Sequence, residues 1–120
     1  MTALKSLAIL LLLFSACSQP EEYYQKIYGK WKAADWLVNG QSAGKNITNV
    51  SFQFNADKTY QSKLGAKGEN GIFKLKSEYL YTTAEGQLEI MVKIAKLTAD
   101  SLVLDMNNAG QSETLLLVKE

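Results

Sequence analysis

The sequence predicts an all-β domain, a small eight-stranded antiparallel up-and-down barrel preceded by a short helix. Two observations and one physical argument support this prediction. From Gly29 onward apolar and polar residues alternate, which is the period of a half-buried strand. The alternating segments are short, and turn signals such as Asn39-Gly40 and Ala84-Glu85-Gly86 separate them. Closing a meander of such strands into a barrel removes its unpaired edges.

Residues 1–16 have the order of an export signal rather than of a folded element. Lys5 precedes an unbroken apolar run from Leu7 to Phe14, and two small residues follow it. The run is much shorter than the roughly 20 residues of a membrane-spanning helix. We therefore expect residues 1–16 to be a cleaved signal peptide.

Cys17 is the only cysteine of the chain, so no disulfide can form within it. Phe14-Ser15-Ala16-Cys17 resembles the lipobox of bacterial lipoproteins, with Phe14 in place of the usual leucine. The resemblance implies that Cys17 begins the mature chain and carries diacylglycerol, with an acyl chain such as palmitate on its amine. The alternative is a chance cysteine beside an ordinary cleavage site. Because several acyl chains hold a protein firmly on a bilayer, we expect a lipid-anchored protein of the bacterial cell envelope, in the outer membrane.

Residues 17–28 form the expected lipidated tether and short helix. Pro20 suits a first helical position, and Gly29 ends the helix. One side of this helix carries Tyr24, Ile27 and Tyr28, which we expect to plug one end of the barrel. The segment Gln19-Pro20-Glu21-Glu22 resembles the acidic surface-export signals of bacterial lipoproteins, or is a solvated linker. Whether the protein faces the periplasm or the outside therefore stays open.

Residues 29–120 form the expected barrel. The alternation predicts strands at 30–38, 49–55, 59–64, 71–76, 79–83, 88–97, 102–106 and 113–119. The residues expected in the barrel interior are Phe52, Phe54, Tyr60, Phe73, Ile90, Val92, Leu102 and Leu104. In the first strand either Trp36 or Leu37 points inward. The continuous apolar run at 115–118 does not show which face of the last strand is buried.

Composition argues against several classes of function. Without Lys5, twelve of the thirteen cations remain against twelve acidic residues, so the mature chain has no basic surface for nucleic acid. The chain contains no histidine, the commonest general base and metal ligand. The acidic residues are scattered, and Glu89 and Glu113 are expected on exposed strand faces. We expect a monomer that is not an enzyme and has no cofactor, no metal site and no nucleic-acid partner.

Gly29-Lys30-Trp31, directly after the helix, resembles the start of lipocalins, and residues 27–119 resemble lipocalin-like domains in lipoproteins of Bacteroidetes-type bacteria. The resemblance is also carried by Phe52, Phe54, Asp57-Lys58-Thr59-Tyr60, Gly71-Ile72-Phe73 and residues 97–104. It implies that Trp31 closes one end of the barrel and that a cation from the last strand covers it. Many lipocalins use an arginine there. This chain has none, so Lys119 is the candidate.

The resemblance implies a membrane-anchored binding module for a small apolar ligand. The alternative is a barrel with a filled core that binds a protein partner, as an inhibitor of secreted enzymes would. Interior space distinguishes the two, because small-molecule sites have volumes of at least a few hundred cubic ångströms. The sequence does not identify a ligand.

Replacing Cys17 by alanine removes the only thiol that can accept a lipid. The variant is expected to move from the membrane fraction to the aqueous fraction of lysed cells, measured by immunoblotting after ultracentrifugation. Retention of Cys17→Ala in the membrane fraction would contradict the lipid anchor.

Overall fold

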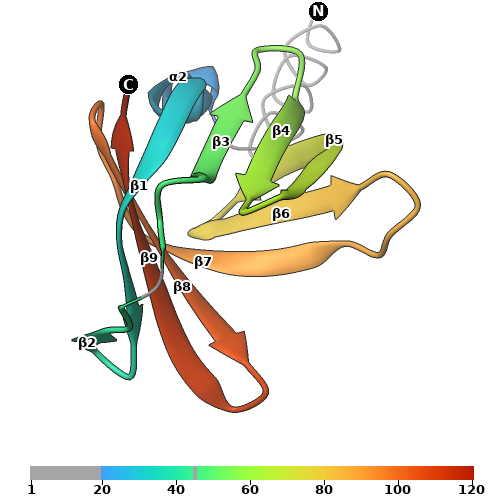
Figure 1. Cartoon of the computed structure of the whole chain (residues 1–120). Coiled ribbons are helices and arrows are strands. Elements are labelled where there is room, and N and C mark those ends of the chain that lie inside the picture. Colours follow the sequence, from blue (N-terminus) through green and yellow to red (C-terminus); the bar gives the residue numbers. More distant parts are fainter. Residues whose placement is uncertain (1–19, 45) are drawn as a thin grey trace, which may run out of the picture.

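The structure is a computed structural model, and it describes residues 20–44 and 46–120. Helix α2 (Glu21–Ile27) precedes an antiparallel sheet (Figure 1). Its strands are β1 (Gly29–Val38), β2 (Gln41–Ser42), β3 (Val50–Phe54), β4 (Thr59–Leu64), β5 (Lys67–Lys76), β6 (Tyr79–Ala84), β7 (Ile90–Leu97), β8 (Ser101–Asn108) and β9 (Gln111–Lys119). Among the described residues, no helix has the length and apolar character needed to cross a bilayer.

The sheet closes into a barrel because β1 pairs on both sides. Its first residues pair with β3, and β1 also pairs with β9 from Trp31↔Lys119 to Val38↔Glu113. Every other barrel strand pairs with its neighbours in chain order, and β2 adds only a two-residue extension to β1. The predicted eight-stranded up-and-down barrel, preceded by a short helix, is confirmed.

Several strands extend further than the alternation predicted. Between the strands expected at 102–106 and 113–119 there is only a two-residue turn, Ala109-Gly110, so β8 and β9 pair up to Asn108↔Gln111. Residues 41–42 form β2 after the turn Asn39-Gly40. Both turns have two consecutive residues with positive φ, the backbone that suits tight hairpins. The ends of these strands are polar and lack the apolar alternation on which the prediction relied. For the same reason β5 begins at Lys67, whereas the predicted strand begins at residue 71.

Two β-bulges keep apolar side chains inside the barrel. The register of β1 against β9 shifts between Ala33 and Asp35, so Ala34 is an extra residue. One extra residue reverses which side chains face inward beyond it. Trp36 therefore lies opposite the buried Leu115 and packs against the core, which answers the alternative between Trp36 and Leu37. A second shift, between Ile94 and Lys96, has the same effect in β7.

The core occupies the end of the barrel that α2 covers. Its most deeply buried side chains are Ile27, Trp31, Phe54, Leu80, Leu102, Leu115 and Leu117. Among the residues expected inside, Phe54, Tyr60, Phe73, Leu102 and Leu104 are buried, whereas Phe52 and Val92 are half-buried. The prediction is wrong for Ile90, which is 53 % exposed. Ile90 is the first residue of β7, and the pairing of β7 with β8 begins only at Lys93, so β8 does not cover this side chain.

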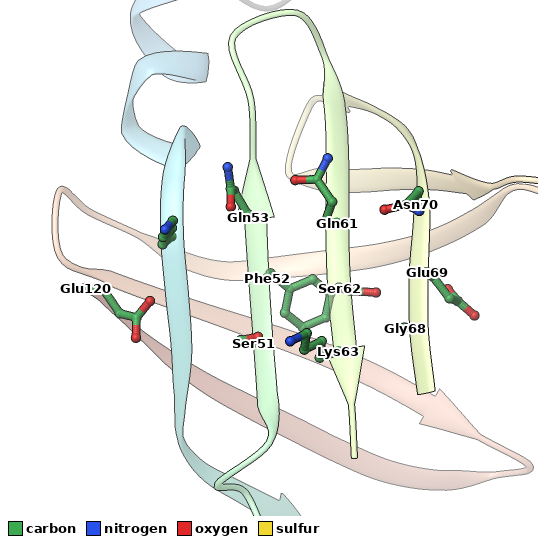
Figure 2. A pocket seen from close by; sticks show the side chains of 11 residues that line it. Ser51, Phe52, Gln53, Gln61, Ser62, Lys63, Gly68, Glu69, Asn70 and Glu120 are labelled. Atoms are coloured by element: carbon green, nitrogen blue, oxygen red, sulfur yellow. The ribbon is translucent and has the colours of Figure 1, made fainter. Parts of the chain in front are cut away.

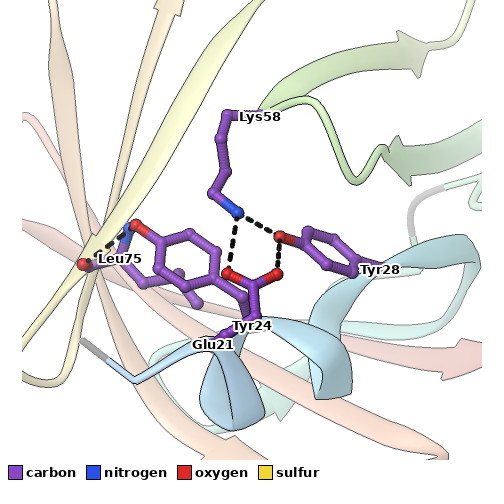
Figure 3. Close-up of polar contacts among 5 residues, drawn as sticks. All are labelled: Glu21, Tyr24, Tyr28, Lys58 and Leu75. Atoms are coloured by element: carbon purple, nitrogen blue, oxygen red, sulfur yellow. Dashed lines mark hydrogen bonds and ion pairs between the residues drawn. The ribbon is translucent and has the colours of Figure 1, made fainter.

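Helix α2 belongs to the same core as the strands. Ile27 is fully buried, and the hydroxyl of Tyr24 donates to the carbonyl of Leu75 (3.3 Å) and accepts from its amide (2.9 Å). These bonds to the β5 backbone are drawn in Figure 3. The helix therefore plugs the barrel as expected. The expected boundary between the helical segment 17–28 and the barrel 29–120 runs through one packed core, because Tyr24 and Ile27 belong to it.

A polar cluster fastens α2 to the turn between β3 and β4 (Figure 3). The ammonium of Lys58 lies 3.3 Å from a carboxylate oxygen of Glu21 and contacts the hydroxyl of Tyr28, which donates to the other oxygen at 2.9 Å. The ammonium also lies 4.0 Å from the ring centroid of Tyr24. The hydrogen bond from Tyr28 lowers the pKa of Glu21, and the bond to Tyr28 raises the pKa of Lys58.

Trp31 and Lys119 close the barrel beside this helix. The indole N–H of Trp31 donates to the carbonyl of Ile27 (2.8 Å), and the ammonium of Lys119 lies 4.7 Å from the Trp31 ring centroid. The ammonium also donates to the carbonyls of Tyr28 (2.5 Å) and Lys26 (3.3 Å). Burial lowers the pKa of Lys119. The expected contact between Trp31 and Lys119 is thus present.

Gly29 leaves room for the Lys119 side chain. A Cβ at Gly29 would lie 3.2 Å from Cδ of Lys119, and the backbone there has a φ of +125°, which disfavours any side chain. The Gly-x-Trp pattern therefore has a physical reason. Glycine makes space for the lysine, and the lysine covers the tryptophan.

Shortening Ile27 to alanine removes fully buried methyl groups from the interface between α2 and the strands. Ile27→Ala is expected to lower the free energy of unfolding by about 2–5 kcal/mol, measured by urea denaturation. Gln25→Ala, at an exposed position of the same helix, is the control and should change it by less than about 0.5 kcal/mol. Equal unfolding midpoints for the two variants would show that the barrel does not depend on the helix.

Replacing Lys119 by methionine keeps an apolar stem over Trp31 and removes the ammonium with its hydrogen bonds. Because such charged bonds contribute roughly 1.5–3 kcal/mol and the ammonium is partly desolvated, we expect Lys119→Met to destabilise the barrel by about 1–2 kcal/mol. Lys96→Met, at an exposed site on β7, is the control in the same urea titration. A Lys119→Met variant as stable as the wild type would show that the ammonium does not hold the barrel closed.

Candidate functional site

A gap between β7 and β8 sets the position of the candidate site. β7 pairs with β6 from Ile90↔Thr82 to Lys93↔Tyr79, but with β8 only from Lys93↔Asp105 onward. β8 continues beyond Asp105 as the partner of β9. The two strands consequently diverge, and in Figure 1 the β6–β7 and β8–β9 turns point in different directions.

A hollow of about 450 Å³ lies at this divergence. It is lined by side chains from five strands: Trp36, Tyr79, Ile90, Met91, Val92, Lys93, Asp105, Met106, Asn107 and Glu113. Val92, Met106 and Trp36 are half-buried and pack against the core, whereas Ile90 and Met91 are exposed at its rim. The hollow thus has an apolar wall that continues from the core to the surface.

Glu113 is the buried charge of this hollow, with only 4 % of its surface exposed. Its carboxylate accepts a hydrogen bond of 2.9 Å from the indole N–H of Trp36. The two side chains lie on the paired strands β9 and β1, and the bulge at Ala34 is what turns Trp36 toward Glu113. A buried carboxylate is costly to desolvate, so hydrogen-bonding partners such as this indole are needed to keep it inside.

The expectation that Glu113 lies on an exposed strand face was wrong. Glu113 shares the inward face of β9 with Leu115 and Leu117, at every second position. The apolar run at 115–118 hid this period, because both faces of the strand carry leucine or valine there. The period of two along a strand would have placed Glu113 inside if Leu115 and Leu117 had been known to face inward.

A second depression, of about 500 Å³, lies on the outside of β3, β4 and β5 (Figure 2). Most of its side chains belong to the outward faces of these strands, including Gln53, Gln61 and Lys63, with Glu120 on the far side. Two of the amides are already engaged, because Gln53 donates to Asn55 (3.1 Å) and Asn55 donates to Gln61 (3.3 Å). We regard it as a polar outer wall, since charges of both signs and side-chain amides line it, with Phe52 as the one aromatic ring among its lining residues.

The residues singled out from the sequence fall in different places. Ile90 and Val92 line the hollow, and Phe52 reaches the outer depression. Phe54, Tyr60, Phe73, Leu102 and Leu104 belong to the packed core, while Gly29, Trp31 and Lys119 close the plugged end. Cys17 lies outside the described residues. Four residues that line the hollow were not among the site residues expected from the sequence, namely Trp36, Glu113, Met91 and Met106.

The plugged end is filled rather than hollow. Phe54 and Phe73 meet edge to face with ring centroids 5.0 Å apart, and Tyr60 and Tyr24 pack beside them. Within residues 20–44 and 46–120, no three His, Cys, Asp or Glu side chains are grouped so that they could hold a metal ion. The side chains that line the hollow offer apolar contact, an indole ring, and carboxylate and other polar groups.

Comparison with known proteins supports the fold. Neither a family model nor a curated protein matches the chain. It is similar to the crystal structure of a lipocalin-like protein from Bacteroides uniformis ATCC 8492, with a TM-score of 0.62 and 16% identity over 79% of this chain and 99% of that one. It is equally similar to an uncharacterized protein from Bacteroides eggerthii DSM 20697, with a TM-score of 0.62 and 15% identity over 78% of this chain and 99% of that one. With its closed barrel and plugging helix, the chain has a lipocalin-like fold.

Proposed function

We propose that this protein is a membrane-anchored binding module that holds a small, largely apolar molecule in the hollow between β7 and β8. The hollow itself is the observation that carries the proposal. Its volume of about 450 Å³ lies in the usual range of roughly 300–1,000 Å³ for small-molecule sites. Such sites combine an apolar lining with a few polar groups, as Val92 and Met106 do here with Trp36 and Glu113.

The exposed apolar rim supports the same proposal. Ile90 and Met91 leave more than half of their surface in water, beside the half-buried Val92 and Met106. Removing apolar surface from water contributes roughly 25 cal/mol per Å². An apolar molecule in the hollow would cover part of this rim, and its own apolar surface would be buried at the same time.

The proposed anchor at Cys17 would place the hollow near a source of apolar molecules. Only residues 18–20 separate Cys17 from α2, and α2 is packed into the barrel. A lipid on Cys17 would thus hold the barrel close to a bilayer. The lipobox resemblance and the short tether support this arrangement.

A module that binds a protein partner is the second candidate. Its support is apolar surface away from the hollow, because Leu88 is 89 % exposed after β6 and Ile72 is 61 % exposed on β5. The filled core at the plugged end is also compatible with it. Binding of a small apolar probe distinguishes the two candidates.

A neutral fluorescent probe, N-phenyl-1-naphthylamine, is expected to bind the chain saturably and with one site, measured by its fluorescence increase. Ile90→Asp places a charge on the rim at little cost to folding, because the side chain is exposed, and should weaken binding about tenfold. Ile72→Asp, at a similarly exposed isoleucine outside the hollow, is the matched control and should bind as the wild type does. Absence of saturable binding, or a loss confined to Ile72→Asp, would contradict the proposal.

A further inference from the structure

We propose that the outer face of the barrel around the depression on β3, β4 and β5 is a second binding surface, and that its ligand is an acidic oligosaccharide. This surface shares no lining residue with the hollow between β7 and β8, so the two sites are separate. The inference follows from three features of the surface, namely a row of side-chain amides, a group of lysines, and a length that exceeds one depression.

A row of amides crosses three neighbouring strands. Gln53 on β3 lies directly opposite Gln61 on β4, and Gln61 lies directly opposite Asn70 on β5, so the three side chains stand side by side (Figure 2). We call these three residues the amide row. Neighbouring strands are about 4.8 Å apart, so the amides follow one another at short intervals. Each amide offers a donor beside an acceptor, a pattern that the hydroxyl groups of a sugar ring can match.

Hydrogen bonds with Asn55 hold the amide row in place. Asn55 accepts from Gln53 (3.1 Å) and donates to Gln61 (3.3 Å), so each glutamine uses one end of its amide and has the other end available. Within residues 20–44 and 46–120, the Asn70 side chain forms no hydrogen bond. Side chains that are already fixed lose little conformational entropy when a ligand binds. The row can therefore bind hydroxyl groups at a small entropic cost.

Three lysines stand beside the amide row. Lys30 on β1 lies directly opposite Gln53, at the end of the row. In the next outward row, Lys32 and Lys63 lie opposite Ser51 from its two sides, so a small side chain separates two long ones. All three lysines are exposed, and none of them forms an ion pair with another described residue. Their ammonium groups are therefore available to the acidic groups of a ligand.

The nearby carboxylates leave an excess of positive charge. The two outward rows carry no acidic residue at their paired positions. Glu120 lines the depression from the side of β1. Glu69 also lines it, but this residue shares the face of β5 that carries the buried Phe73 and Leu75, and it accepts a hydrogen bond from Gln87 (3.5 Å). Three lysines thus stand against one carboxylate on the outward side, which favours an anionic ligand.

The length of the surface favours a chain of sugar units over a single anion. A second depression, of about 490 Å³, lies over β4, β5 and β6, and Gln61 and Asn70 line both depressions. The second depression adds the hydroxyl groups of Thr59 and Thr83, and its one carboxylate, Glu85, follows β6. A lone anion would fill a small part of this surface. An acidic oligosaccharide can contact the lysines at one end and the amides and hydroxyl groups along the rest.

The test compares three ligands by NMR titration of the isotope-labelled chain at pH 7 and low salt. Hexagalacturonate has carboxylates and hydroxyl groups, maltohexaose has hydroxyl groups only, and a short poly(acrylate) has carboxylates only. Hexagalacturonate is expected to shift the side-chain amide signals of Gln53, Gln61 and Asn70. It should bind at least roughly tenfold more tightly than the other two, because it alone can form both ion pairs and hydrogen bonds with this surface.

Two outcomes of this titration would overturn the inference. One is that maltohexaose or poly(acrylate) binds as tightly as hexagalacturonate. The other is that hexagalacturonate leaves the signals of the amide row unchanged. Either outcome would leave the proposed function standing, because the hollow is tested with a different probe and with different variants.

A double variant tests the lysines. Lys30→Gln combined with Lys63→Gln should weaken the binding of hexagalacturonate about tenfold, as the loss of two exposed ion pairs would. Lys76→Gln combined with Lys96→Gln is the matched control, because it removes the same charge at two exposed lysines outside both depressions, and it should bind as the wild type does. An equal loss in the two double variants would show that the overall charge attracts the ligand, and it would overturn the assignment to this surface.

Asn70→Leu tests the amide row. Leucine has a similar size and removes both polar ends of the side chain, so the affinity for hexagalacturonate should fall roughly two- to tenfold, as the loss of a neutral hydrogen bond would cause. Asn70 is exposed, so the thermal unfolding midpoint should stay that of the wild type. An unchanged affinity would overturn the assignment of the row. If Asn70→Leu does not fold, the ranking of the three ligands on the wild-type chain still decides the inference.

Discussion

The pairing of β1 with β9 is the contact on which the other features of this protein depend. Without it the remaining strands would form an open sheet with two exposed edges. The pairing begins at Trp31↔Lys119, where the lysine covers the indole ring and also binds two carbonyls at the end of α2. One side chain thereby joins the first strand, the last strand and the helix.

The same strand pair also creates the difference between the two ends of the barrel. Near α2, β1 presents Trp31 to a core packed with aromatic rings. After the bulge at Ala34, it presents Trp36 to Glu113 instead. A single inserted residue therefore changes which side chain faces inward, and it separates the packed half of the barrel from the half that is hollow.

Much of the fold could be predicted from the sequence, because alternation and turn signals are local properties. The strands around Phe54 and Phe73, the Asn39-Gly40 turn and the contact between Trp31 and Lys119 all follow from such signals or from the family resemblance. The candidate site was mostly missed. Alternation shows which face a side chain shares, but not whether a neighbouring strand covers it. Ile90 was therefore expected inside, although β8 has already diverged there, and Glu113 was expected outside, although β1 covers it.

The closure has a consequence for the order in which the fold can form. The bond between the Lys119 ammonium and the Lys26 carbonyl joins residues 93 positions apart. Contacts of such long range form slowly, because the entropy of closing a long loop is lost before the contact stabilises the chain. While the chain is made from its N-terminus, β1 can pair with β3, but its edge toward β9 stays unpaired and α2 lacks its contacts with Lys119 until β9 has been made. The barrel is therefore the last part of the fold to be completed, because it closes only when β1 and β9 meet.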